Sequence, residues 1–166
     1  SLLRLWHYNK DIKIIIILRN PILRSFSHWN KNVNAGLENK NFYDSLLFEL
    51  EKNKNFRSKN RNFSYLHRSL YSTQIKQAFN IFNKKNIFFL KTENLIKNPI
   101  KEMNQIYEFL NLQKLDKLQS RVSNPENYYN RRIDKKSLLL IKSILKDDII
   151  ETGKLLNWNI EDWLQY

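Results

Sequence analysis

The stretch LRNPILRSFSHW, residues 18–29, joins a strand to a helix and decides the fold. Residues 13–18 form a continuous run of mostly β-branched side chains, which is typical of a strand inside a parallel sheet. Asn20 and Pro21 then favour a helix start, because Asn caps helix N-termini and Pro is favoured at the first helical position. The stretch therefore predicts a strand, a tight turn and a helix that runs from Pro21 to about Asn34.

The rest of the chain continues this alternation of strands and helices. Residues 86–91 form a second compact apolar run, and Pro99 opens a pattern in which apolar positions recur every three or four residues. Two buried strands between long helices predict an α/β domain, with a parallel sheet flanked by helices in three layers. We expect a single, partial domain over residues 1–166, with further strands of its sheet upstream. Helical patterns are also expected at residues 1–8, 42–50, 63–82 and 138–152.

Charged and hydroxyl side chains at the strand-to-helix junction are suited to binding a phosphate. Arg19 follows the strand at the position where open α/β sheets bind their ligands. Arg24 and Ser27 are three residues apart, so they share one face of the expected helix. With the positive helix N-terminus, these groups could hold a dianionic phosphate. The alternative is that Arg19 and Arg24 are only surface charges that flank a turn.

The positions of Arg19, Pro21, Arg24, Ser27 and Trp29 resemble a known signature. Sulfotransferases that use 3′-phosphoadenosine 5′-phosphosulfate (PAPS) have this pattern where they bind the 3′-phosphate of the donor. In that family the first Arg and the Ser eight residues later bind this phosphate, which implies the same role for Arg19 and Ser27. The family often has a basic residue at the position of Arg24. The resemblance implies the P-loop NTPase-like sulfotransferase fold, with PAPS as donor and adenosine 3′,5′-bisphosphate as product.

Later segments of the chain fall in the order of the same family. YSTQIKQAFNIF, residues 71–82, and IFFLKTENLIKNPIKEMNQIYEFLNL, residues 87–112, are similar to family segments, and Trp163 resembles a Trp that closes the domain. Arg131 and Arg132 lie where the family has a mobile segment that closes over the nucleotide. The resemblance therefore implies that these two arginines add basic contacts to the 3′-phosphate.

The phosphate loop of the family, which holds the 5′-phosphosulfate with Lys and Thr side chains, has no counterpart in the sequence. Neither Gly36 nor Gly153 is followed by Lys and Thr after a strand. We therefore expect an N-terminally truncated domain, whose catalytic residues lie upstream of Ser1 and which is inactive alone. The resemblance implies transfer of a sulfuryl group to a hydroxyl or amine of a carbohydrate or small-molecule acceptor. A general base would take the acceptor's proton, and the loop Lys would stabilise the leaving phosphate.

The formal net charge of +13 favours a polyanionic partner, because clustered Lys and Arg release condensed counterions when they bind one. The chain also uses Lys, Asn and Ile heavily and Gly, Ala and Pro sparingly, which is the pattern that an AT-rich genome imposes through its codons. On this interpretation, many of the lysines are solvated surface residues and not part of a binding site. A basic nucleic-acid-binding module is therefore the alternative function, although we favour a nucleotide over nucleic acid as the partner. A degenerate fragment with no ligand is the third interpretation.

Several classes of site and location are excluded or disfavoured by composition. Cysteine is absent and there are only three histidines, so we expect neither disulfides nor a metal site. The longest apolar run, residues 14–18, is far below the roughly 20 residues that a spanning helix needs. The first residues do not resemble a signal peptide, so we expect a cytoplasmic protein without a membrane span. An exposed sheet edge could pair with a second copy, which leaves a homo-oligomer open.

Overall fold

The computed structural model divides the chain into two compact units. Residues 1–20 and 73–123 form the first unit, and residues 21–72 and 124–166 form the second. The boundary after Asn20 falls inside the strand-to-helix junction that the sequence singles out. The structure describes residues 2–52, 63–117 and 131–165.

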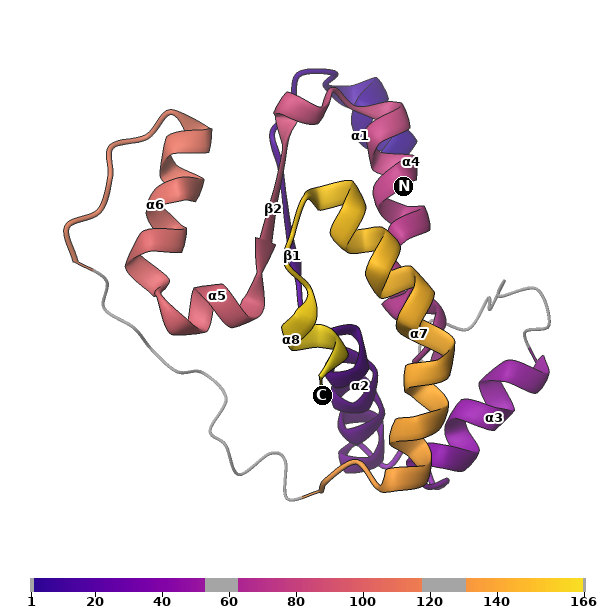
Figure 1. Ribbon diagram of the computed structural model, residues 1–166. Coiled ribbons are helices and arrows are strands. Elements are labelled where there is room, and N and C mark those ends of the chain that lie inside the picture. Colours follow the sequence, from indigo (N-terminus) through magenta and orange to yellow (C-terminus); the bar gives the residue numbers. More distant parts are fainter. Residues whose placement is uncertain (1, 53–62, 118–130, 166) are drawn as a thin grey trace. The chain divides into compact units, whose positions relative to one another are not determined.

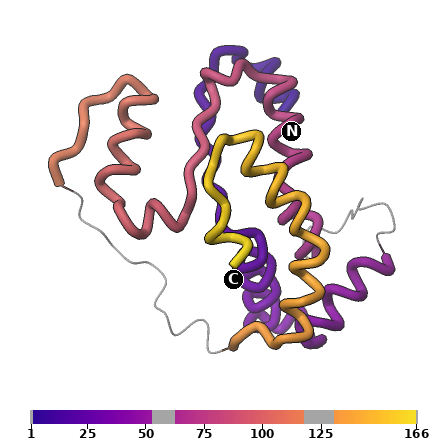
Figure 2. Tube along the Cα trace, viewed as in Figure 1, coloured from indigo at the N-terminus to yellow at the C-terminus, as the bar shows by residue number. Residues whose placement is uncertain are grey.

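A two-stranded parallel sheet is the centre of the first unit. Strands β1 (Ile14–Leu18) and β2 (Ile87–Lys91) run side by side along the chain trace (Figure 2). Leu18 is paired with Lys91 in the register. Both strands lie where the sequence predicts them, and their parallel pairing is confirmed. Since parallel strands end at the same edge of a sheet, the residues that follow Leu18 and Lys91 lie at one edge.

Helices cover both sides of this sheet, so the first unit has the predicted three layers (Figure 1). On one side, Ala78, Phe82 and Ile87 form a buried cluster against which side chains of the first helix and of both strands pack. On the other side, the rings of Phe88 and Phe109 lie 5.4 Å apart. The helices are α1 (Leu2–Tyr8) and α4 (Tyr71–Ile81) on the first side, and α5 (Thr92–Lys97) and α6 (Pro99–Leu110) on the second.

Strand β1 is less buried than its unbroken apolar sequence predicts. Ile14 and Ile16 pack against the buried cluster, whereas Ile15 and Ile17 are 37% and 52% exposed. Successive side chains of a strand point to opposite faces, and the helices on the second side leave the face of β1 that carries Ile15 and Ile17 partly open to solvent among the described residues. The prediction of burial on both faces is therefore wrong for these residues.

The second unit is built around α7 (Lys135–Leu156), which packs against α2 (Pro21–Asn34), α3 (Phe42–Lys52) and α8 (Glu161–Leu164). Helix α2 has the predicted bounds. It ends because Gly36 adopts a positive φ of 69°, a conformation that costs glycine little and that turns the chain out of the helix. The buried core of this unit includes Ile22, Phe26, Trp29, Phe42, Leu46, Tyr65, Leu66, Tyr71, Ile141, Leu145, Ile149 and Trp163.

The helix predicted over residues 63–82 begins only at Tyr71. Its first part is held in another conformation by the buried carboxylate of Glu49, which accepts hydrogen bonds from the backbone N–H groups of Leu66 (2.8 Å) and His67 (3.0 Å). Because Glu49 belongs to a distant helix, local periodicity carries no signal of this contact. The short 3-10 turns are η2 (His67–Ser69) and η3 (Lys84–Asn86).

Candidate functional site

Arg19 lies at the edge of the sheet where both parallel strands end. It follows Leu18 of β1, which is paired with Lys91 of β2. Glu93, two residues after β2, accepts a 2.8 Å hydrogen bond through Oε1 from the backbone N–H of Asn20. A carboxylate from one strand end therefore fixes the backbone beside Arg19 at the other.

The same face of α2 carries Arg24 and Ser27, which are three residues apart. Nη1 of Arg24 donates to the backbone carbonyl of Tyr65 (3.1 Å) and to Oγ of Ser69 (3.2 Å), and Nη2 lies 3.4 Å from Nδ1 of His28. Burial lowers the pKa of Arg24 from its ordinary value. These contacts give Arg24 a structural role, which is to attach the segment before α4 to α2.

A buried polar network sets the orientation of α2 within the second unit. Ser25 donates from Oγ to the backbone carbonyl of Tyr65, and its Oγ also lies 2.7 Å from Oγ of Ser69. The hydroxyl of Tyr65 donates to Oε2 of Glu38 (3.0 Å) and accepts from Nδ2 of Asn32 (3.1 Å). Buried polar groups that are fully paired specify one arrangement. The network therefore fixes the rotation of α2 about its own axis within the unit, and with it the side of the helix on which Ser27 lies.

Arg131 is held against the face of α2 that carries Ser27. Its Nη1 donates to Oδ1 of Asn30 (2.6 Å) and to Oδ1 of Asn34 (2.8 Å), and its guanidinium carbon lies 5.9 Å from the ring centre of Trp29. Positions 27, 30 and 34 of one helix share a face. The structure thus brings two predicted donor ligands, Ser27 and Arg131, to one side of α2. The two amide partners were not predicted, although their spacing from Ser27 is a signal for them.

Arg132 is exposed and precedes the start of α7 by three residues. At this helix start, Asp134 accepts from the backbone N–H of Ser137 (2.9 Å) and from its hydroxyl (2.5 Å). Both hydrogen bonds lower the pKa of Asp134. An ionised carboxylate therefore already occupies N–H donors at this helix N-terminus, so a bound anion would depend on the arginine side chains. The rest of the predicted loop, residues 119–130, lies outside the described residues.

The five predicted donor ligands are divided between the two units. Arg24, Ser27, Arg131 and Arg132 belong to the second unit, whereas Arg19 belongs to the first. The convergence of Arg19 and Ser27 on one anion is not a property of either unit alone, and it stays a prediction.

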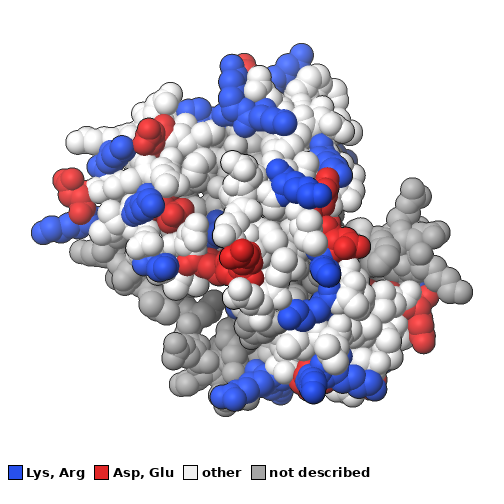
Figure 3. Space-filling view, in the orientation of Figure 1, with Lys and Arg blue, Asp and Glu red and all other residues white. Residues whose placement is uncertain are grey.

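Charge and composition of the described chain limit the other kinds of site. On the face drawn in Figure 3, acidic side chains lie among the basic ones. Within residues 2–52, 63–117 and 131–165, no group of three or more His, Cys, Asp or Glu side chains could hold a metal ion. No helix in that part of the chain is long and apolar enough to cross a membrane.

A family model described as "Sulfotransferase domain" matches residues 2–163, which is nearly the whole chain. The chain belongs to the sulfotransferase family. The family and the sulfotransferase fold predicted from the sequence are thereby confirmed. The match includes the β1–α2 junction with Arg19 and Ser27, as well as the start of α7 after Arg132.

Curated relatives of this sulfotransferase chain are named as heparan sulfate glucosamine 3-O-sulfotransferases. It is 23% identical over 123 residues to human heparan sulfate glucosamine 3-O-sulfotransferase 3B1, with 74% of this chain and 29% of the relative covered. It is 26% identical over 127 residues to mouse heparan sulfate glucosamine 3-O-sulfotransferase 5, with 76% of this chain and 35% of the relative covered. The chain thus spans about a third of the length of these relatives.

A solved structure supports the fold of the sulfotransferase chain. The crystal structure of a sulfotransferase from Alicyclobacillus acidocaldarius superposes with a TM-score of 0.82 at 21% sequence identity. The match covers 98% of this chain and 62% of that one. At this identity the likeness establishes the α/β fold with its parallel sheet.

Proposed function

We propose that this chain belongs to an enzyme that transfers a sulfuryl group from PAPS to an acceptor hydroxyl or amine, and that it binds the 3′-phosphate of the donor. The observation that carries the proposal is the β1–α2 junction. Within a sulfotransferase-family chain, Arg19 follows a parallel strand directly and Ser27 lies on the helix that comes next. Ligands of such folds bind beyond the carboxyl ends of the strands, which is where Arg19 lies.

Each proposed ligand supplies a different interaction to the phosphate. The guanidinium of Arg19 offers a planar pair of donors and a permanent charge, so it can bind two phosphate oxygens at once. The hydroxyl of Ser27 donates one further hydrogen bond. Hydrogen bonds to a charged partner contribute about 1.5–3 kcal/mol each, which is enough to discriminate between nucleotides with and without the 3′-phosphate.

Arg131 is the best supported of the remaining candidates. Both of its described hydrogen bonds use Nη1, and a guanidinium has five N–H donors. The amides of Asn30 and Asn34 can therefore orient the side chain while other donors bind a phosphate. Arg132 would add charge from its exposed position, and Arg24 would act mainly through its contacts with Tyr65 and Ser69.

The acceptor is proposed from the names of the relatives. Because the two relatives described above are named as heparan sulfate glucosamine 3-O-sulfotransferases, we propose a carbohydrate hydroxyl as the acceptor of the intact enzyme. The sequence predicts that residues 1–166 bind the donor without transferring its sulfuryl group, since they hold no Lys- and Thr-bearing phosphate loop. The cytoplasmic location and the homo-oligomer also stay predictions.

Isothermal titration calorimetry tests the proposed function. The chain should bind adenosine 3′,5′-bisphosphate at least about tenfold more tightly than adenosine 5′-monophosphate, which corresponds to about 1.4 kcal/mol. Arg19→Ala should abolish this difference while the binding of the monophosphate is retained. Arg68→Ala is the matched control, because Arg68 is an exposed arginine of η2 and its loss changes the net charge equally. Equal affinities of the wild-type chain for both nucleotides would refute the proposal.

Titration with single-stranded DNA distinguishes a nucleic-acid-binding module, the alternative function, from the proposed donor site. A basic nucleic-acid-binding module would bind DNA with an affinity that falls steeply as salt is raised, because binding releases counterions. The Arg19→Ala and Arg68→Ala variants would then weaken binding to a similar extent. A donor site instead predicts that only Arg19→Ala affects adenosine 3′,5′-bisphosphate.

A further inference from the structure

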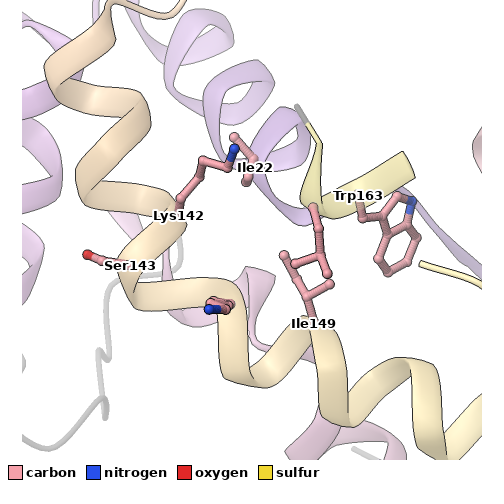
Figure 4. Close-up of a pocket in the computed structure, with 7 residues that line it drawn as sticks. Ile22, Lys142, Ser143, Ile149 and Trp163 are labelled. Atoms are coloured by element: carbon pink, nitrogen blue, oxygen red, sulfur yellow. The ribbon is translucent and has the colours of Figure 1, made fainter. Parts of the chain in front are cut away.

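A pocket of about 310 Å³ lies in the second unit, where α7, α8 and the first turn of α2 meet (Figure 4). The buried side chains of Ile22, Ile149 and Trp163 form its apolar floor. This volume is at the lower end of the range of about 300–1,000 Å³ that is usual for small-molecule sites. The lining residues are Ile22, Lys142, Ser143, Lys146, Ile149, Trp163 and Leu164.

The charged groups of the pocket are all basic. Lys142 and Lys146 are four residues apart on α7, so both ammonium groups lie on one face of that helix. In Figure 4 the side chain of Lys142 extends from α7 toward Ile22 of α2. The described residues that line the pocket include no Asp or Glu. An apolar floor below two cations favours a ligand with an apolar body and an anionic head.

The pocket does not share the face of α2 that carries Ser27. Ile22 and Ser27 are five residues apart, which places their side chains about 140° apart around a helix of 3.6 residues per turn. The hydroxyl of Ser27 and the pocket therefore lie on different sides of α2. A ligand in the pocket would be recognised by residues that the proposed donor site does not use.

We propose that this pocket binds a small amphipathic anion, namely an aromatic ring or short alkyl group that bears one carboxylate or sulfate. The apolar body rests on Ile22, Ile149 and Trp163, and the anionic head pairs with Lys142 and Lys146. The anionic group supplies selectivity because a neutral analogue of the same shape gains only the apolar contact.

The test compares 2-naphthoate with 2-naphthamide, two probes of nearly equal shape that differ in charge. Titrations of the isotope-labelled chain, followed by backbone and indole amide NMR, should give at least about tenfold tighter binding of 2-naphthoate. The shifted resonances should cluster at residues 142–149 and 163–164. The double variant Lys142→Gln/Lys146→Gln should reduce the affinity for 2-naphthoate to that for the amide, with the unfolding temperature nearly unchanged.

A control and a competition experiment keep this test independent of the donor site. Lys101→Gln/Lys154→Gln removes the same charge from exposed lysines outside the pocket, and it should keep the preference for 2-naphthoate. Adenosine 3′,5′-bisphosphate should not displace the probe. The proposal is overturned if neither probe binds, if both bind equally, if the double variant keeps the preference, or if the bisphosphate competes. The first three results leave the nucleotide titration of the donor site unaffected, whereas competition by the bisphosphate would show that the nucleotide itself binds in the pocket.

Discussion

The carboxylate of Glu93 accepts a 2.8 Å hydrogen bond from the backbone N–H of Asn20, so the second residue after one strand is tied to the second residue after the other. Arg19 is covalently next to this contact. The second oxygen of Glu93 is buried and has no hydrogen-bond partner among the described residues. The contact therefore fixes the backbone from which the proposed phosphate ligand projects.

Replacing Glu93 should destabilise the fold. Glu93→Ala leaves the N–H of Asn20 without its acceptor, which should lower the free energy of unfolding by about 1–3 kcal/mol. Glu93→Gln keeps an acceptor oxygen and should cost less. Urea denaturation measures both, with Glu108→Ala as the control, because the exposed 3.2 Å pair of Glu108 and Lys114 should contribute less than about 1 kcal/mol. Equal losses for Glu93→Ala and Glu108→Ala would contradict this assignment.

Asp148 of α7 should be a strong determinant of where α4 begins. Its carboxylate accepts from the backbone N–H groups of Tyr71 (2.7 Å) and Ser72 (3.2 Å), which belong to the first helical turn and have no acceptor within the helix itself. Asp148→Ala should lower the free energy of unfolding by about 1–2 kcal/mol, as the loss of a helix cap does. The neighbouring exposed Asp147→Ala should have little effect. If chemical denaturation ranks the two variants in the opposite order, the capping role is wrong.

Glu49 should make stability depend on pH. Burial raises the pKa of its carboxyl above the ordinary value of 4.5, although hydrogen bonds from His67 and Leu66 oppose the shift. A raised folded-state pKa means that the folded state binds the proton more tightly than the unfolded state. The stabilisation from the protonated form is then complete below about pH 4.5 and is lost as the pH rises through the folded pKa.

Glu49→Gln removes this titration. The free energy of unfolding of the wild-type chain, relative to that of the variant, should therefore be highest at acidic pH and should decrease as the pH rises toward neutral. Denaturant titrations of both proteins at a series of pH values from acidic to neutral measure this difference in unfolding free energy. A difference that stays constant with pH, or one that grows toward neutral pH, would show that Glu49 is not the titrating group.

Removing the hydroxyl of Ser27 should weaken the binding of adenosine 3′,5′-bisphosphate selectively. A lost hydrogen bond to a charged phosphate costs about 1.5–3 kcal/mol, so the dissociation constant should rise at least about tenfold. The affinity for adenosine 5′-monophosphate should stay the same in Ser27→Ala. Ser143→Ala serves as the control, since the hydroxyl of Ser143 donates to the carbonyl of Leu140 in its own helix. A parallel loss for both nucleotides would indicate a structural rather than a binding role.

Elements with strong local signals could be predicted from the sequence. The pairs Asn20-Pro21 and Asn98-Pro99 predict helix starts, and the structure confirms both. Both strands lie within about a residue of their predicted bounds. In these cases the signal is carried by residues that are adjacent in sequence, because proline fixes its own backbone angle and β-branched residues favour strands.

Features that depend on distant residues could not be predicted in this way. The late start of α4 depends on Glu49 and Asp148, of which the second is 77 positions from Tyr71. Arg131 was predicted from its place in the family pattern, but its amide partners Asn30 and Asn34 are 101 and 97 positions away. Such pairs appear only when the chain is folded, since periodicity reports the environment of a residue and not its partner.

Phosphorus NMR of adenosine 3′,5′-bisphosphate tests the central claim most directly, because the two phosphates of one ligand give separate signals. When the wild-type chain is added, the 3′-phosphate resonance should shift and broaden more than the 5′-phosphate resonance, and Arg19→Ala should remove this selectivity. A response confined to the 5′-phosphate, or one that Arg19→Ala leaves unchanged, would contradict the assignment of this chain as the 3′-phosphate-binding part of a sulfotransferase.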